Sequence, residues 1–284
     1  MKTTVMRRPV PIHAETFARA IIGKTTETVV EADWMIFPYV TPAHRPAVAE
    51  CNARGIKTLG YWLGSDSWKA LRDMSHQRVL PTYDMEMCVH DRIHKELSSW
   101  GRVSRIVPSC VRSVPPLSTP RPQYRLVGVY MPRRDGVYQF EQVCRIASRC
   151  EDTNFLFYGA DVLPPIPGNC KNAGRLLPYE ASELLKAISC LLRMCDHDGL
   201  AQNLIETKML GKHVITNYPY EGCLYAPDED SAVDFINQKQ THLRDMGKAP
   251  DLYREMCSPD AFRKKVTSYM EAYDAMQRKR KTGS

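Results

Sequence analysis

Short apolar runs alternate with amphipathic segments along most of the chain. Runs typical of buried strands occupy positions 34–37, 58–63, 87–89, 105–107, 126–130, 154–159, 190–192 and 213–216. Helical spacing fills the intervals at 45–54, up to Leu97, at 140–148, at 179–186 and just before His213. In the clearest of these helices, Phe140, Val143, Cys144 and Ala147 fall at i, i+3, i+4 and i+7. Strands alternating with helices predict an α/β protein whose parallel sheets are covered on both faces.

A proline-dense segment at 113–122 is the best candidate for a linker, because proline cannot continue a helix and fits poorly in a central strand. It separates an amino-terminal domain, 1–112, from a second domain, 123–258. In open α/β sheets ligands bind at the carboxyl ends of the strands, so we expect a cleft there. Segment 259–284 is a final helix with a basic tail, which packs on the second domain or crosses back to the first.

The composition is that of a folded protein, with 284 residues, 43% hydrophobic and 25% charged. No apolar run approaches the roughly 18–20 residues that a membrane helix needs. Residues 1–9 lack the apolar core of a signal peptide. The ten cysteines form no C-x-x-C pair, which argues against a zinc ribbon or a thioredoxin-like motif. We therefore expect reduced thiols in a cytoplasmic protein, or in the host cytoplasm if a phage encodes it.

The net charge of +7 allows a polyanionic partner such as a nucleic acid, an acidic lipid surface or a nucleotide. It does not choose among them, because many enzymes that act on anionic substrates are equally basic.

The segment 198–206 carries the most informative chemistry. Asp198 lies in a predicted loop and Glu206 in the helix that follows, so both carboxylates can face a ligand held over the start of that helix. The free N–H groups near the helix start favour an anion such as a diphosphate, and they belong to Gly199, Leu200, Ala201 and Gln202. The carboxylates can accept hydrogen bonds from sugar hydroxyls on either side of it.

This segment resembles the acid-x7-acid signature of retaining glycosyltransferases with the GT-B fold. Asp198 takes the place of the first glutamate, while Gly199, Glu206, Gly211 and Val214 match the signature. The resemblance implies that the first acid touches the donor sugar and that the second touches the ribose of the nucleotide. It also implies the GT-B architecture, two Rossmann-like domains facing a central cleft.

Upstream segments extend the resemblance over about residues 124–217. Positions 127–136 resemble the family's phosphate-binding strand and loop, in which Arg133 and Arg134 are the available cations. Positions 158–161 and 172–180 resemble the family's glycine turn and its strand-loop-helix element.

The amino-terminal half matches less of the pattern. Gly64-Ser65-Asp66 resembles the family's loop that faces the donor sugar, which implies a catalytic role for Asp66. An equal alternative is that this carboxylate caps the helix that starts near Ser67. Gly64, Ser65 and His44 are the acceptor-side candidates, although a histidine at a helix start is more often structural. Because the glycine-rich first loop of the family is missing, we expect a domain trimmed by its first strand-loop unit.

Asp196-His197-Asp198 also forms a D-x-D pair, which binds a divalent metal in GT-A enzymes. Here it falls inside the acid-x7-acid segment of a chain with two α/β halves. We therefore expect no required metal or cofactor, and a nucleoside diphosphate sugar, most simply a UDP-sugar, as the donor substrate.

The implied reaction is retaining transfer of a hexosyl or pentosyl group to an acceptor hydroxyl. Small size, positive charge and no membrane segment favour double-stranded DNA with a hydroxymethylated base, as in phage-type DNA glycosyltransferases. Basic residues suited to phosphate contacts are Arg7, Arg8, Arg45, Lys69, Arg72 and Arg78. A peripheral-membrane enzyme of envelope polysaccharide or lipid-linked sugar, and an inactive sugar-nucleotide-binding protein, are the alternatives. The sequence does not set the oligomeric state.

Overall fold

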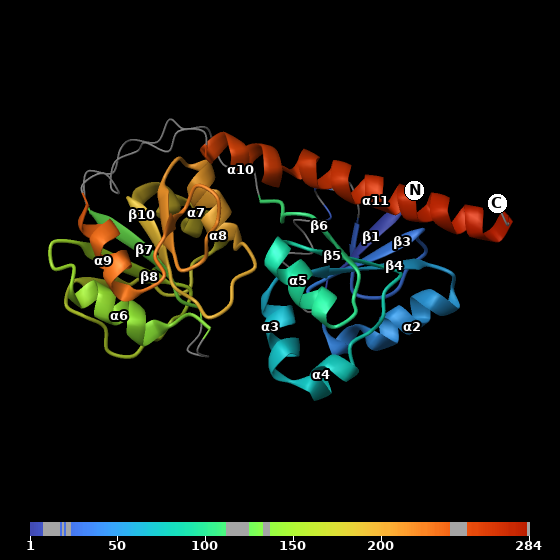
Figure 1. Ribbon diagram of the computed structural model, residues 1–284, viewed down its shortest axis with the longest axis horizontal. Helices are drawn as coiled ribbons and strands as arrows, with labels where there is room; N and C mark the ends of the chain where they lie inside the picture. The colour runs from blue at the N-terminus through green and yellow to red at the C-terminus, as the bar shows by residue number, and fades with distance from the viewer. Residues whose placement is uncertain are drawn as a thin grey trace. The chain divides into compact units, whose positions relative to one another are not determined.

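The computed structural model describes residues 1–7, 18, 20, 24–111, 125–132, 137–238 and 249–282. The chain divides into two compact units, and each is built around a parallel sheet with six described strands (Figure 1). Unit 1 joins Met1–Ser113 to Glu255–Ser284, and unit 2 is the continuous stretch Val114–Arg254. The α/β class predicted from the alternation of strands and helices is confirmed. The proline-dense segment 113–122 lies outside the described residues.

The sheet of unit 1 has the strand order β2-β1-β3-β4-β5-β6. Its strands are β1 (Thr3–Met6), β2 (Lys24–Thr26), β3 (Trp34–Pro38), β4 (Lys57–Trp62), β5 (Met85–Cys88) and β6 (Ser104–Ile106). The helical segments between them are η1 (Pro42–His44), α2 (Arg45–Ala53), α3 (Ser65–Arg72), α4 (Met74–Arg78) and α5 (Asp91–Ser99). Strand β1 opens the sheet almost at the first residue, so unit 1 has as many described strands as unit 2 despite the expected trimming.

The sheet of unit 2 has the strand order β12-β11-β10-β7-β8-β9. Its strands are β7 (Leu126–Tyr130), β8 (Asn154–Tyr158), β9 (Cys170–Asn172), β10 (Cys190–Arg193), β11 (His213–Thr216) and β12 (Leu224–Tyr225). The helices are α6 (Phe140–Ser148), α7 (Pro178–Ala187), α8 (Gln202–Met209) and α9 (Glu229–Asn237). The chain adds β8 on one side of β7 and later β10 on the other. The strand order therefore reverses between β7 and β10, which is where open α/β sheets form a ligand crevice.

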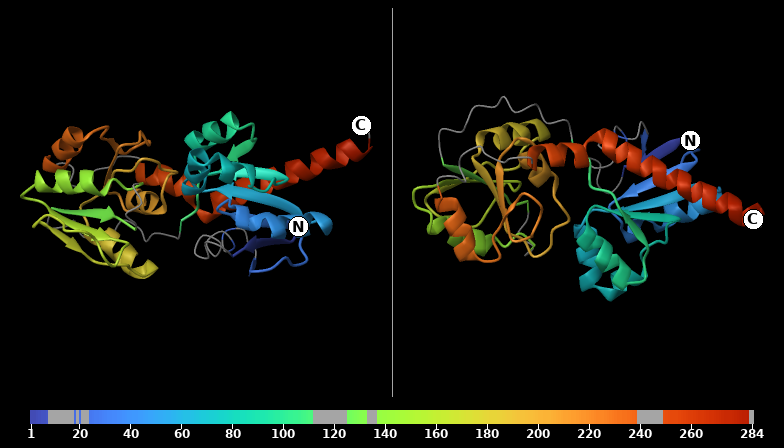
Figure 2. Two further views of the ribbon diagram at one scale, coloured as in Figure 1. Left: turned by 90° about the horizontal axis from the view of Figure 1, so that it is seen from below. Right: turned by 45° about the horizontal axis from the view of Figure 1, so that its top comes forward.

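The last helix, α11 (Pro259–Thr282), follows α10 (Ala249–Cys257) and packs on unit 1 (Figure 2). Phe262, Val266 and Met270 lie on one face of α11 and are buried in the core of unit 1. At the polar margin Lys57 forms an ion pair with Asp274, with 2.7 Å between Nζ and Oδ1. Of the two positions that the sequence allowed for this helix, it occupies the one against the first part of the chain.

All ten cysteines are free thiols, and eight of them are buried. Among the described residues, no helix combines the length and the apolar character needed to cross a membrane.

Candidate functional site

The four inner strands of unit 2 end in polar or aromatic side chains. Tyr130 closes β7, Tyr158 closes β8, Arg193 closes β10 and Thr216 closes β11. Because all these strands are parallel, their last residues lie along one edge of the sheet. Arg193 stands beside the point where the strand order reverses. The candidate site is therefore built at this edge, within unit 2 alone.

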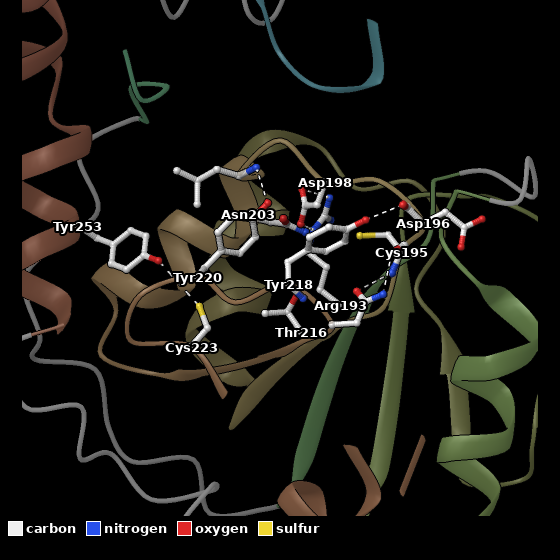
Figure 3. Close-up of polar contacts among 12 residues, drawn as sticks. Arg193, Cys195, Asp196, Asp198, Asn203, Thr216, Tyr218, Tyr220, Cys223 and Tyr253 are labelled. Atoms are coloured by element: carbon white, nitrogen blue, oxygen red, sulfur yellow. Dashed lines mark hydrogen bonds and ion pairs between the residues drawn. The ribbon is translucent and has the colours of Figure 1, made fainter. Parts of the chain in front are cut away.

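Arg193 and Asp198 form a buried, two-pronged ion pair (Figure 3). Nε of the arginine lies 2.6 Å from one carboxylate oxygen, and Nη2 lies 3.0 Å from the other. The two residues are only 8% and 2% exposed. Burial lowers the pKa of Arg193, but the neighbouring groups, with Asp198 first among them, together raise that pKa well above the ordinary value. Arg193 is thus charged, and its ion pair with Asp198 is close to neutral as a whole.

The loop that carries Asp198 is held by tyrosine hydroxyls. The Leu200 amide donates to the Tyr220 hydroxyl at 3.0 Å, and the Tyr218 hydroxyl donates to the Asp196 carbonyl at 2.5 Å. The two tyrosine rings stack with centroids 6.1 Å apart. Leu200 has a φ of 63°, a left-handed conformation that a bulky residue adopts only when its surroundings enforce it. The loop is therefore rigidly organised around the acid.

One of the backbone amides that we expected to bind an anion already has a hydrogen-bond partner within the protein. We predicted free N–H groups near Gly199, Leu200, Ala201 and Gln202, but the Leu200 amide donates to Tyr220. The helix α8 starts at Gln202, and its N-cap residue Ala201 supplies no side-chain hydrogen bond to the first turn. The anion-binding role of Gly199, Ala201 and Gln202 remains a prediction.

Glu206 is half-buried on α8. Burial raises the pKa of the Tyr158 hydroxyl, and the charge of Glu206 raises it further. Asn203, one turn earlier, donates to the Tyr158 hydroxyl at 3.2 Å. Asp198 is thus attached to the end of β10, while α8, the helix that carries Glu206, contacts the end of β8 through Asn203. These two strands lie on either side of β7, so the loop with Asp198 and the helix with Glu206 both reach the edge at which the strand order reverses.

Aromatic rings surround the same edge of the sheet. The Tyr130 ring lies 5.2 Å from that of Tyr158 and 5.8 Å from that of Tyr138. The Arg193 guanidinium lies 5.6 Å from the centre of the Tyr138 ring. Gly159, with φ +112°, allows this packing, because a Cβ there would come within 2.9 Å of the Tyr130 ring. Sequence reasoning missed Arg193, Tyr130 and Tyr138, although a lone arginine ending an apolar strand was a visible signal.

Three buried polar atoms at this edge have no hydrogen-bond partner in the described part of the chain. One is a donor, Nη1 of Arg193, and two are acceptors, Oδ1 of Asn203 and Oε1 of Gln139. Buried polar groups in native structures are nearly always paired, so unpaired ones need an explanation.

In unit 1, Asp66 binds backbone amides. Its carboxylate accepts hydrogen bonds from Val40 at 2.9 Å and Gly64 at 2.8 Å, and also from the amides of Leu63 and Ser67. The side chain is 1% exposed; burial raises its pKa to about 6, against the opposing effect of these four amides. Asp66 thus ties the loops after β3 and β4 to the start of α3. Gly64, with φ 113°, is the N-cap residue of α3. Asp66 therefore lies within the first turn of that helix, and its carboxylate binds these amides from there. Its catalytic role remains a prediction.

His44 lies in the interior of unit 1. His44 is 4% exposed, its Nδ1 lies 3.1 Å from the Tyr83 hydroxyl, and its ring packs 5.0 Å from that of Phe37. The imidazole therefore belongs to the core of unit 1. The acceptor-side roles of His44, Gly64 and Ser65 remain predictions.

The remaining candidates concern the phosphate cations and a metal. Arg133 and Arg134 lie outside the described residues. Within the described ranges, no three His, Cys, Asp or Glu side chains group as a metal site. Asp196 and Asp198 have different partners, since Asp196 accepts from Gln139 at 2.6 Å while Asp198 pairs with Arg193.

Comparison with known proteins gives a match in structure. No family model matches the chain, and no curated protein sequence matches it. Anabaena HepE, solved with UDP and glucose, matches with a TM-score of 0.70 at 8% identity, over 96% of this chain and 100% of HepE. The lipopolysaccharide outer core galactosyltransferase WaaB matches with a TM-score of 0.66 at 9% identity, over 96% of this chain and 99% of WaaB.

The protein has the GT-B fold. A third GT-B structure, S. aureus TarM with UDP among its ligands, matches with a TM-score of 0.65 at 10% identity. That match covers 84% of this chain but only 55% of TarM, so the chain spans little more than half the length of that relative. At such low identity these likenesses establish the fold, and the GT-B architecture predicted from the acid-x7-acid segment is confirmed.

Proposed function

We propose that this GT-B protein is a glycosyltransferase that uses a UDP-sugar donor. The observation that carries the proposal is that the loop with Asp198 and the helix with Glu206 meet the strand ends on either side of β7, at the reversal point of the second sheet. Carboxylates there suit the hydroxyls of a sugar and a ribose, and the fold is one in which TarM and HepE were solved with UDP.

In the proposed reaction, an acceptor hydroxyl replaces the diphosphate on the anomeric carbon with retention of configuration. Negative charge builds on the leaving diphosphate. The amides at the start of α8, together with Arg133 and Arg134, are the proposed groups that stabilise this charge. Glu206 would hold the ribose of the nucleotide and Asp198 the transferred sugar.

Calorimetric titration with UDP tests the donor site. We expect Glu206→Ala to weaken UDP binding at least about tenfold, because the ribose hydroxyls lose a charged hydrogen-bond acceptor. Glu183→Ala is the matched control, since Glu183 lies on α7 with a side chain 67% exposed, and it should bind UDP normally. Unchanged UDP binding by Glu206→Ala would contradict the proposed site.

The proposed chemistry requires no metal, and a chelator tests this. Transfer should proceed at an unchanged rate in EDTA. Activity that is lost in EDTA and restored by manganese would instead assign Asp196 and Asp198 to a metal.

For the acceptor, we propose double-stranded DNA with a hydroxymethylated base. The net charge of +7 supports it, as do two exposed cations on α3, Lys69 and Arg72. Binding to such DNA should weaken steeply with salt, because each phosphate contact releases counterions. Salt-insensitive binding would contradict this acceptor.

A lipid-linked envelope acceptor is the second candidate. The neighbouring helix α4 exposes 66% of Met74 and is followed by Val79, 38% exposed, with exposed Arg78 between them. Exposed apolar side chains beside cations suit the surface of an anionic membrane. Two experiments separate these candidates. One is sedimentation with vesicles of anionic lipid. The other is mass analysis of plain DNA, hydroxymethylated DNA and lipid-linked acceptors after incubation with nucleotide sugars.

A further inference from the structure

Arg193 uses only two of its three nitrogens within the described structure. Nε and Nη2 hold Asp198, while Nη1 is buried and has no hydrogen-bond partner among the described residues. The residue is 8% exposed, so bulk water does not satisfy this N–H group in its place. An unpaired donor on a buried guanidinium is costly, and such groups are rarely kept without a use.

The position of Nη1 points to a ligand. Arg193 ends β10 beside the reversal of strand order, and its guanidinium packs near the Tyr138 ring. The unpaired acceptors Asn203 Oδ1 and Gln139 Oε1 come from α8 and from the residue that precedes α6. These elements follow β10 and β7, so one donor and two acceptors gather at the same edge of the sheet.

The near-neutral charge of the Arg193–Asp198 pair indicates which class of ligand it can bind. Asp198 already neutralises the guanidinium, so Nη1 has little net charge to offer a phosphate. A hydroxyl suits it better, because a hydroxyl accepts one hydrogen bond and donates another. The neighbouring Asp198 carboxylate is an acceptor for that second bond. A sugar ring presents adjacent hydroxyls of this kind.

We propose that Arg193 is a specificity-determining residue that donates from Nη1 to a ring hydroxyl of the transferred sugar while holding Asp198 in place. This inference rests on the proposed function and refines it: the sugar, rather than the diphosphate, is what the Arg193–Asp198 pair binds. The geometry motivates this inference, because Nε and Nη2 of the guanidinium bind Asp198 and Nη1 is left for the sugar.

The test compares Arg193→Lys with the wild-type protein by calorimetry. Lysine keeps the positive charge beside Asp198 but cannot hold both carboxylate oxygens and also supply a third N–H in the same direction. The titrants are UDP, UDP-glucose, UDP-galactose and UDP-N-acetylglucosamine. We expect the Kd for UDP to stay within about twofold, and the ratio of the Kd for the preferred UDP-sugar to the Kd for UDP to rise about tenfold.

Two further variants protect the test against misfolding. In the double variant Arg193→Gln with Asp198→Asn, both buried charges disappear together, so no unpaired charge remains, and the same rise in the ratio is expected. Arg145→Lys is the matched control, because Arg145 forms an exposed ion pair with Glu229 in the same unit and should change neither Kd. Thermal melting verifies that each variant is folded.

The outcomes separate this inference from the proposed function. An unchanged ratio, or an equal loss of affinity for UDP and for every UDP-sugar, overturns the role of Arg193. Binding of UDP without binding of any UDP-sugar by the wild-type protein also overturns it. Failure of the wild-type protein to bind UDP contradicts the proposed function itself.

Discussion

Two buried aspartates are stabilised in different ways. Asp66 is surrounded by backbone amides, so its partners are fixed by the chain path of two loops. Asp198 pairs with a side chain, so its environment depends on Arg193. Substitution at Asp66 should therefore act on the stability of unit 1, whereas substitution at Arg193 should act on ligand binding.

Asp66→Asn should destabilise unit 1. The amide group of asparagine points a donor at amides that need an acceptor, and buried donors left unpaired cost about 1–3 kcal/mol. We expect the free energy of unfolding at pH 7 to fall by about that amount in chemical denaturation. A variant as stable as the wild type would show that the amides find other partners.

The same carboxyl group should make the stability depend on pH. Its pKa of about 6 in the folded state exceeds the ordinary 3.8, so folding favours the protonated form. This contribution is fully present below about pH 4 and is lost as the pH rises through 6. The difference in unfolding free energy between wild type and Asp66→Asn should therefore shrink by about 2–3 kcal/mol from pH 4 to pH 7. A difference that grows with pH would mean that the four amides outweigh burial.

At the scale of elements, strands with long apolar runs were predicted from the sequence, whereas strands with short runs were not. Strands β3, β4, β7 and β8 have five or six residues each and were recognised from the sequence. Strands β1, β2 and β12 have four, three and two residues, too few to show a period.

In the candidate site, too, some features were predicted from the sequence and others were not. The acids at 198 and 206 were placed correctly on a loop and a helix, because their spacing is local. The ion pair of Arg193 with Asp198 and the unpaired Nη1 were not predicted, because they depend on how the loop folds back over the strand. The tyrosine hydroxyls that hold that loop come from beyond β11 and leave no local pattern.

Lys212 illustrates an interaction between elements that a mutation can test. Its buried Nζ donates to the carbonyls of Leu185 at 2.8 Å and Ile188 at 2.6 Å, and also to that of Lys186. These carbonyls lie at the carboxyl end of α7 and just beyond it, so the lysine caps that helix. Lys212→Met should lower the unfolding free energy of unit 2 by about 2–3 kcal/mol, as measured by urea denaturation. Lys171→Met, at an exposed position, should change it by less than about 0.5 kcal/mol; equal effects would contradict the capping role.

At the scale of the whole molecule, unit 1 is assembled from both ends of the chain. Phe262 packs against the Tyr61 ring at 5.8 Å, and Tyr273 meets the Trp34 ring at 5.4 Å. The core of unit 1 is therefore incomplete without α11. Unit 2 is made from one continuous stretch and does not depend on that helix for its core.

Removal of residues 259–284 should unfold unit 1 while unit 2 persists. The deletion takes away three buried apolar side chains of the core, each costing several kcal/mol when lost. Calorimetry should then detect one remaining unfolding transition, that of unit 2. Deletion of residues 278–284 is the control, because the described residues of this segment are exposed, and it should preserve both transitions. A cooperative unit 1 in the longer deletion would contradict the dependence on α11.

This two-ended assembly reverses the usual order of folding on the ribosome. Domains generally fold as they emerge, the first-made one first. Here the first-made unit cannot close its core until α11 is translated, roughly 10–30 s later at common rates of elongation. During that interval the surfaces around Tyr61 and Trp34 stay uncovered while the later unit matures. The nascent chain should therefore bind chaperones through its early segment, and be released only after α11 has emerged.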